Sequence, residues 1–199
     1  MDPRFAELQA SLERRPGRSL NLPGLVLRES AVLVPLFLRA GAPHLLFTKR
    51  PSTLRTHAGQ ISFPGGSRDV EDPTPLHTAL RETEEELGID RSGIQVLGLL
   101  DEIPTLTEFR IAPFVGVIPG DGRYRPSVEE IDEIIEVPVN HLLTLAGPRI
   151  EKHPVRGKPR DVYYYDYGNH VIWGATARIL RDLLVLLGEL QTWNEESAR

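Results

Sequence analysis

Cysteine is absent from the 199 residues of this chain. Disulfide bonds, thiolate metal sites and a cysteine nucleophile are therefore excluded. Long apolar runs are absent too, since none reaches membrane-spanning length, and the segment from Met1 to Leu8 has no uninterrupted apolar core like that of a signal peptide. We expect a soluble, cytoplasmic protein that has no membrane partner.

The chain also lacks an excess of positive charge, because 28 acidic residues outnumber 23 lysines and arginines and give a net charge of -5. General nucleic-acid binders need a basic surface, so we expect no nucleic-acid partner. The six histidines show no metal-ligand spacing, and neither a Gly-x-Ser-x-Gly nor a Walker-type Gly-Lys-Ser/Thr sequence occurs. These absences disfavour zinc hydrolases, serine hydrolases and P-loop enzymes.

The most informative segment that is present spans residues 65–89 and joins a glycine turn to an amphipathic helix. Thr74 followed by Pro75 is a good N-cap and first-turn pair, and Gly88 is a typical C-terminal stop. The spacing therefore predicts a helix that begins after Thr74 and ends before Gly88.

Three carboxylates share one face of this helix, because residues three and four apart are neighbours at 3.6 residues per turn. They are Glu82, Glu85 and Glu86, which repel one another unless a cation lies among them, and carboxylates are ligands that Mg2+ and Mn2+ prefer. A solvated acidic face is the alternative, and on the helix alone it is the better interpretation. Gly65 and Gly66 change the balance, because glycines allow the backbone to approach a ligand or metal closely.

This segment resembles the Nudix box, which reads Gly, five residues, Glu, seven residues, Arg-Glu, an apolar residue, any residue, Glu-Glu, any residue, Gly, apolar. Here Gly66 is followed after five residues by Asp72, and after eight more by residues 81–89, RETEEELGI. Asp72 replaces Glu, the spacer is one residue longer, and Thr83 replaces an apolar residue. The first two departures occur together in the coenzyme A pyrophosphatase subgroup of the Nudix family.

Two further segments are similar to that subgroup. Residues 46–50 (LFTKR), Arg55, Gly59 and residues 63–66 (FPGG) look like the coenzyme A signature that precedes the box, from which Phe47 and Pro51 depart. Residues 170–179 (HVIWGATARI) are similar to the start of the subgroup's last helix. The resemblance covers about residues 31–187 and implies an α/β fold, the Nudix α/β/α sandwich with a mixed β-sheet between helices.

The expected metal ligands for Mg2+ or Mn2+ are Glu82, Glu85 and Glu86, and the resemblance adds the backbone carbonyl of Gly65 or Gly66 as a possible further ligand. Glu85 is also a candidate general base.

The remaining site residues come from other segments and from the family pattern. By resemblance, Arg81 pairs with a nearby carboxylate and fixes its rotamer, and Arg50 and Arg55 face the coenzyme A phosphates together with Gly65 and Gly66. A carboxylate from outside the helix, Glu130 or Glu133, is the alternative general base, although a solvated acidic turn is the better interpretation for either residue alone.

The expected activity is metal-dependent hydrolysis of the pyrophosphate linkage of coenzyme A or acyl-coenzyme A, which gives 3',5'-ADP and a 4'-phosphopantetheine product. ADP-ribose, dinucleotides or nucleoside triphosphates are alternative substrates, and a Nudix-like module that binds a nucleotide without cleaving it is a third hypothesis.

One domain is expected at this length. We predict an N-terminal helical arm and loop at 1–28, the Nudix hydrolase domain at 29–190 and a C-terminal tail at 191–199. An apolar pattern over 179–190 indicates a buried helix face or, alternatively, a homodimer contact. Other predicted elements are a hairpin at 31–38 and 44–49, strands at 61–63, 95–100, 110–118 and 131–137, a short helix at 140–145, a hairpin at 161–167 and 170–173, and a solvated basic loop at 149–160.

Overall fold

The computed structural model describes residues 1–21, 24, 26–53, 58–105, 108–145, 147–155 and 157–197. Its elements in chain order are α1 (Pro3–Arg14), β1 (Arg28–Arg39), β2 (Ala42–Lys49), β3 (Ile61–Ser62), β4 (Gly65–Ser67), α2 (Pro75–Leu87), η1 (Arg91–Gly93), β5 (Gln95–Leu99), β6 (Ile103–Pro104), β7 (Phe109–Val117), β8 (Glu133–Pro138), α3 (Val139–Thr144), β9 (Arg149–Val155), β10 (Lys158–Tyr167), β11 (His170–Trp173), α4 (Gly174–Gly188) and α5 (Gln191–Ser197).

The main sheet is mixed, as expected from the sequence. Its central order is β3-β2-β1-β7-β5, with β4 on β1, β6 on β7 and β8 on β2. The β1 and β7 strands run parallel, and the other pairs are antiparallel. The predicted hairpin is β1–β2, which turns through Ala40 and Gly41 at positive φ.

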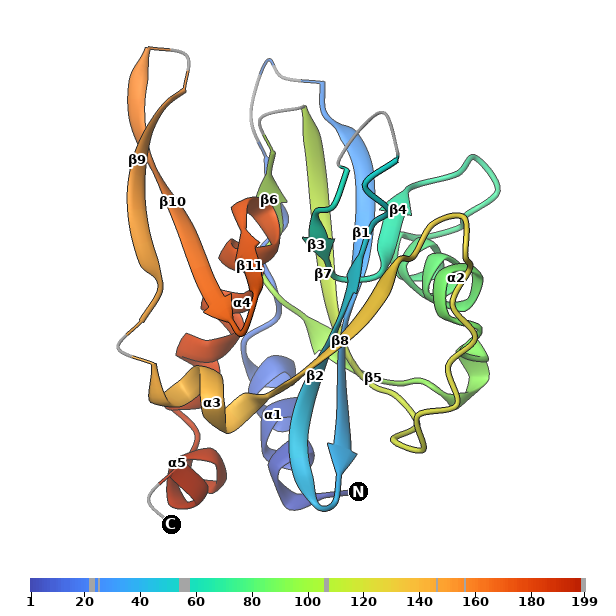
Figure 1. Ribbon diagram of the computed structural model, residues 1–199, viewed down its shortest axis with the longest axis vertical. Coiled ribbons are helices and arrows are strands. Elements are labelled where there is room, and N and C mark those ends of the chain that lie inside the picture. Colours follow the sequence, from blue (N-terminus) through green and yellow to red (C-terminus); the bar gives the residue numbers. More distant parts are fainter. Residues whose placement is uncertain are drawn as a thin grey trace.

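Helices cover both faces of this sheet (Figure 1), which confirms the α/β/α sandwich. Alternate residues of a strand point to opposite faces, and β1 shows this division. Leu33 and Phe37 join a cluster with Leu87 of α2, whereas Val34 and Leu36 join the larger core that α1 and α4 also enter. The sheet therefore separates α2 from the other long helices.

The two terminal helices pack together against the larger core. Phe5 and Leu8 of α1 are buried, and Trp193 of α5 is fully buried, with its indole N–H donating to the carbonyl of Arg4 at 3.2 Å. The segment 191–199, for which the sequence predicts a tail, thus contains a helix whose largest side chain lies in the core. The predicted domain boundaries themselves stay a prediction.

The C-terminal part forms a second sheet, β11-β10-β9. The predicted hairpin at 161–167 and 170–173 is confirmed as β10–β11. The prediction of a loop at 149–160 is wrong, because these residues form β9 and the start of β10. Both segments are largely exposed, so no buried face gives them an apolar periodicity. In the described ranges, no helix is long and apolar enough to cross a membrane.

Candidate active site

The helix α2 carries Glu82, Glu85 and Glu86 and is called the acidic helix below. It begins and ends where its capping residues predict. The Thr74 side chain accepts a hydrogen bond from the backbone N–H of His77 at 3.4 Å, and Gly88 closes the helix at φ 66, in the left-handed region that favours glycine. On the sheet side, Ala79 packs against Ala31 of β1 and Ala112 of β7. These small side chains let α2 lie close to the strands that carry the glycine turn.

The two glycines of the turn lie very close to neighbouring atoms. A Cβ on Gly65 would lie 2.4 Å from the carbonyl oxygen of Ala31, and a Cβ on Gly66 would lie 2.5 Å from the carboxylate of Glu82. The backbone of β1 therefore requires glycine at position 65, whereas a side chain at position 66 would displace the carboxylate end of Glu82. The carbonyl of Gly66 also accepts a hydrogen bond from the Ser30 hydroxyl at 2.7 Å.

The three carboxylates of α2 differ strongly in exposure. The Glu85 side chain is 56% exposed and that of Glu82 is 18% exposed, whereas Glu86 retains only 4% of its accessible surface. The acidic face thus runs from solvent into the protein, with Glu86 at its buried end.

Glu86 is the most perturbed group of this face. Burial, with smaller contributions from the charges of Glu82 and Glu130, raises the pKa of Glu86 to about 8, against the opposing effects of Arg50 and a backbone hydrogen bond from Gly65. Burial likewise raises the pKa of Glu82. The Oε2 atom of Glu86 is buried and has no hydrogen-bond partner. A cation beside it would satisfy this oxygen and relieve the repulsion.

Arg81 holds the outer carboxylates. Its guanidinium lies 2.9 Å from Asp72, 3.0 Å from Glu82 and 2.9 Å from Glu85. The Arg81 guanidinium keeps the pKa of buried Asp72 well below its usual range, and a hydrogen bond from the Thr78 hydroxyl acts in the same direction. The sequence predicts that Arg81 pairs with a nearby carboxylate. In the structure Arg81 pairs with Asp72, and Glu82 and Glu85 lie at the same guanidinium.

This arrangement also separates the three acids of α2. Within the part of the chain that the structure describes, no three acidic or histidine side chains surround a common point where a metal ion could be held. The carboxylates of Glu82 and Glu85 instead lie at the Arg81 guanidinium, at 3.0 and 2.9 Å. The side chains of Glu82 and Glu85 would have to rotate for all three to share one cation.

The segment before β8 brings Glu130 to the site. The backbone N–H groups of Arg125 and Ser127 donate to the carbonyls of Leu87 and Glu86, at 2.7 and 2.9 Å. These are end carbonyls of α2 that the helix itself leaves unpaired. Docked in this way, the segment places the Glu130 charge close enough to raise the pKa of both Glu82 and Glu86.

Glu133, the other candidate base outside α2, is engaged elsewhere. Its carboxylate lies 3.1 Å from Nζ of Lys49 and 3.2 Å from Nε2 of His170. Sequence reasoning missed this role of His170, because no local pattern connects the start of β11 with the start of β8. The structure therefore groups Glu130, and not Glu133, with the acids of α2.

Of the cations predicted to bind substrate, Arg50 lies at the site. Its positive charge lowers the pKa of Glu86, and its Nε is buried without a hydrogen-bond partner. Arg55 lies outside the described residues, so its predicted role in phosphate binding stays a prediction.

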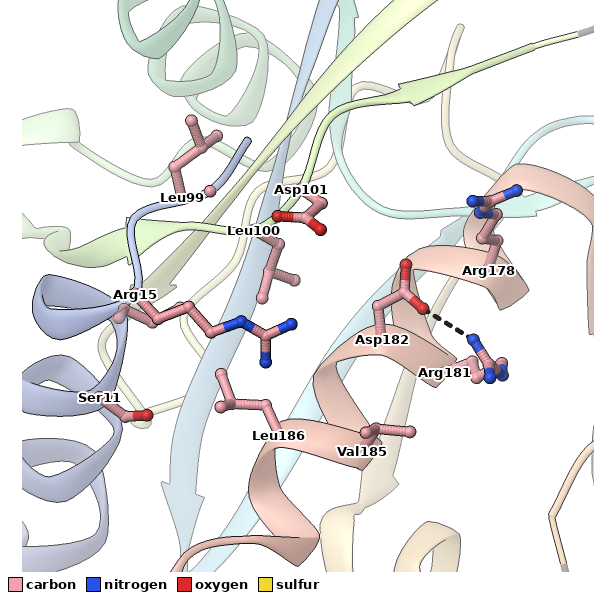
Figure 2. Close-up of a pocket in the computed structure, with 12 residues that line it drawn as sticks. Ser11, Arg15, Leu99, Leu100, Asp101, Arg178, Arg181, Asp182, Val185 and Leu186 are labelled. Atoms are coloured by element: carbon pink, nitrogen blue, oxygen red, sulfur yellow. Dashed lines mark hydrogen bonds and ion pairs between the residues drawn. The ribbon is translucent and has the colours of Figure 1, made fainter. Parts of the chain in front are cut away.

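A separate cavity of about 300 Å3 lies between α1 and α4 (Figure 2). Arg15 points into it between Leu100 and Leu186, and Arg181 pairs with Asp182 at its other side. Its lining contains none of the acids of α2 and neither glycine of the turn. We place the active site at the acidic helix, because the perturbed carboxylates gather there.

Comparison with known proteins identifies the family of the chain. The family profile described as NUDIX domain matches residues 27–158. A relative from Cronobacter sakazakii, named uncharacterized Nudix hydrolase NudL, is 40% identical over 166 residues, which cover 81% of this chain and 84% of the relative. A protein of the same name from Shigella flexneri is 37% identical over 189 residues, 93% of this chain and 92% of the relative. The chain belongs to the Nudix family.

Solved structures with a similar backbone include a C. elegans Ap4A hydrolase binary complex, with a TM-score of 0.49 and 17% identity, covering 60% of this chain and 86% of that chain. The NUDIX domain of Shewanella oneidensis NrtR, complexed with ADP ribose, has a TM-score of 0.46 and 13% identity and covers 68% of this chain and 86% of that chain. The family assignment rests on the profile and the sequence relatives.

Nudix hydrolases generally use divalent metal ions, and the residues present suit such an ion. The donors are hard carboxylate oxygens, one of which, on Glu86, is buried without a partner. The glycine at position 66 leaves room beside Glu82 that any other residue would fill.

Proposed function

We propose that this chain hydrolyses the pyrophosphate linkage of coenzyme A or acyl-coenzyme A and releases 3',5'-ADP and a 4'-phosphopantetheine product. The observation that carries the hydrolase proposal is the buried Glu86 carboxylate, which has a partnerless oxygen and a raised pKa among Glu82, Glu130 and Arg50. Such a group destabilises the folded protein unless it serves a bound cation. A module that only binds a nucleotide has no need of it.

Glu82, Glu85 and Glu86 would hold Mg2+ or Mn2+, with a carbonyl of the Gly65–Gly66 turn as a possible further ligand. When bound, the cation neutralises phosphate oxygens and makes hydroxide available near neutral pH. Arg81 orients Glu82 and Glu85 and is itself fixed by its ion pair with buried Asp72.

The protein groups then have to bind the phosphates and accept a proton. We assign phosphate binding to Arg50, because its charge acts on Glu86 and its buried Nε lacks a hydrogen-bond partner. The attacking water gives its proton to Glu85 or Glu130, its oxygen forms the new bond to phosphorus, and the bridging P–O bond breaks. Glu133 is a poorer base, because Lys49 and His170 already engage it.

The coenzyme A assignment is supported by the sequence alone. The signature comprises residues 46–50, Arg55, Gly59 and residues 63–66, and it is joined by Asp72 with the longer spacer before Arg81 and by residues 170–179. The experiment is to incubate the purified protein with Mg2+ and a panel of diphosphates, and to identify the products by mass spectrometry. Coenzyme A should give 3',5'-ADP and 4'-phosphopantetheine. If coenzyme A stays intact while ADP-ribose, a dinucleotide or a triphosphate is consumed, the coenzyme A assignment is wrong. If no diphosphate is cleaved with any divalent cation, the hydrolase proposal fails.

A variant tests the mechanism separately. Glu85→Gln should lower turnover by roughly 10²- to 10⁴-fold and leave folding unchanged, because the side chain is 56% exposed. Glu84→Gln is the matched control, since Glu84 lies on the same helix but pairs with Arg91, and it should turn over like the wild type. A near-normal rate in Glu85→Gln would remove that residue from the mechanism.

A further inference from the structure

The carboxylate of Asp72 is buried beside the acidic helix and accepts four hydrogen bonds. Two come from one guanidinium, because Nε of Arg81 lies 3.1 Å from Oδ1 and Nη2 lies 2.9 Å from Oδ2. The other two reach Oδ2 from the backbone N–H of Asp69 at 3.0 Å and from the Thr78 hydroxyl at 2.9 Å. Such a two-pronged pairing fixes the plane of the guanidinium relative to the carboxylate.

The Thr78 hydroxyl is the donor that ties this carboxylate to the helix without carrying a charge. Thr78 is fully buried, and it lies three residues before Arg81 on α2, so the two side chains are neighbours on one face. A threonine on a helix has few populated side-chain rotamers. The position of its hydroxyl is therefore set by the helix itself, whereas Asp69 belongs to the segment between β4 and α2.

The departures from the Nudix box bear on this contact. Asp72 replaces the glutamate of the box, and the spacer before Arg81 is one residue longer. Since aspartate is one methylene shorter than glutamate, its carboxylate depends more closely on where the backbone places it. The backbone N–H of Asp72 donates to the carbonyl of Asp69 at 3.1 Å, and the side chains of Thr78 and Arg81 tie the turn formed in this way to α2.

The other end of the Arg81 guanidinium contacts the proposed metal ligands. Its Nη1 atom lies 3.0 Å from Glu82 and 2.9 Å from Glu85. Because a guanidinium is planar and rigid, a rotation at its Asp72 end also moves the donor at the two glutamates. Among the described residues, no hydrogen bond joins Thr78 to either glutamate, so its influence on them passes through Asp72 and Arg81.

We propose that Thr78 is a positioning residue for the metal site. Its buried hydroxyl fixes the Asp72 carboxylate, which in turn fixes the guanidinium that orients Glu82 and Glu85. This role rests on the proposed function, because it concerns the same carboxylates. Valine has nearly the volume of threonine and would fill the same space, so the hydroxyl and not the volume carries the proposed role.

The test is Mn2+ binding, measured from the electron paramagnetic resonance signal of the free ion. In Thr78→Val the dissociation constant should rise roughly tenfold, the lower end of the range for outer partners of metal ligands. Thr78→Ser restores a hydroxyl and should recover most of the wild-type affinity. Wild-type affinity in Thr78→Val, or a loss that Thr78→Ser does not recover, would overturn the proposal.

Thr83→Val is the matched control. Thr83 is fully buried on the same helix, but its hydroxyl donates to the carbonyl of Ala79 at 2.7 Å and contacts no acid of the site. Its Mn2+ affinity should therefore equal that of the wild type. An equal loss of affinity in both valine variants would mean that any buried hydroxyl of the helix has this effect, which contradicts a specific role of Thr78.

A double variant separates positioning from a general loss of stability. Asp72→Ala removes the carboxylate that Thr78 contacts, so the addition of Thr78→Val should leave the Mn2+ affinity where Asp72→Ala puts it. A further fall as large as in the single variant would show that Thr78 acts independently of Asp72, and the proposal would be wrong.

These measurements need no hydrolysis, so the two proposals can fail separately. A protein that binds Mn2+ in a Thr78-dependent manner but cleaves no diphosphate refutes only the proposed function. A protein that cleaves coenzyme A and binds Mn2+ equally well in Thr78→Val refutes only the role of Thr78. No Mn2+ binding by the wild type would refute both.

Discussion

Glu86→Gln should stabilise the metal-free protein, and should do so more at pH 8 than at pH 5. In the folded protein, burial and the charges of Glu82 and Glu130 raise the pKa of Glu86 from its ordinary 4.5 to about 8. Below pH 4.5 the group is protonated in both the folded and the unfolded chain, and its contribution to stability is fully present. Between pH 4.5 and about 8 only the unfolded chain releases the proton, so this stability is lost as the pH rises.

The size of the effect follows from the same two values. At 1.36 kcal/mol for each pH unit between 4.5 and about 8, the upper limit is about 5 kcal/mol of folding free energy. Glutamine has nearly the same shape, does not ionise, and can place an N–H donor where the Glu86 Oε2 atom now has no partner. The amide would face Glu82 and Glu130, which both accept hydrogen bonds.

The assay is urea unfolding, followed by circular dichroism in the presence of a chelator at several pH values from 5 to 8. The difference between Glu86→Gln and the wild type should grow with pH over this window, whereas Glu84→Gln, a Glu-to-Gln change on the outer side of the same helix, should show no such growth. Adding Mg2+ should stabilise the wild type in proportion to ligand binding and the variant much less. A difference in unfolding free energy that is constant with pH, or that favours the wild type at pH 8, would refute the conclusion that the ionised Glu86 carboxylate destabilises the metal-free protein.

Three other changes test the surroundings of the site. Gly66→Ala would place a Cβ 2.5 Å from the Glu82 carboxylate, so diphosphate turnover should fall roughly 10²-fold, as expected when a catalytic group moves by about 1 Å. Asp72→Asn removes the buried partner of Arg81 and should cost roughly 1–3 kcal/mol in urea unfolding. Trp193→Ala empties a fully buried site and should cost about 3–5 kcal/mol, measured in the same way.

Each of these has its own control or contrary outcome. Gly93→Ala is the control for the glycine change, because its new Cβ would meet only Pro119 at an ordinary 3.7 Å, and it should turn over normally. Wild-type stability of Asp72→Asn would mean that solvent replaces the ion pair. Wild-type stability of Trp193→Ala would mean that α5 is the tail that the sequence predicts.

Local signals explain which elements the sequence could predict. The ends of α2 follow from Thr74 and Gly88, which act within one turn of the helix, and the β1–β2 hairpin follows from a short turn between two apolar runs. In contrast, β8 pairs with β2 instead of its chain neighbour β7, and β9 has no apolar face. Such pairings depend on residues far apart in the chain, so a local pattern cannot indicate them.

The candidate site likewise has features that the sequence predicts and features that depend on tertiary packing. Helical spacing groups Glu82, Glu85 and Glu86, but it cannot predict that the face runs inward, so that Glu86 is buried while Glu85 is exposed. That difference arises when α2 packs on β1 and the segment before β8 docks on the end of the helix. The bridge from Glu133 to His170 likewise exists only after both sheets have formed.

The contact between the terminal helices has a consequence for biosynthesis. Glu7 of α1 accepts hydrogen bonds from the backbone N–H groups of Gln191 and Thr192, at 3.1 and 3.0 Å, next to the indole that binds the Arg4 carbonyl. On the ribosome, the part of α1 that contacts α5 can therefore be covered only after residues 191–193 have emerged, whereas the part that packs on β5 can be covered earlier. Until then the part that contacts α5 is a surface that chaperones can recognise.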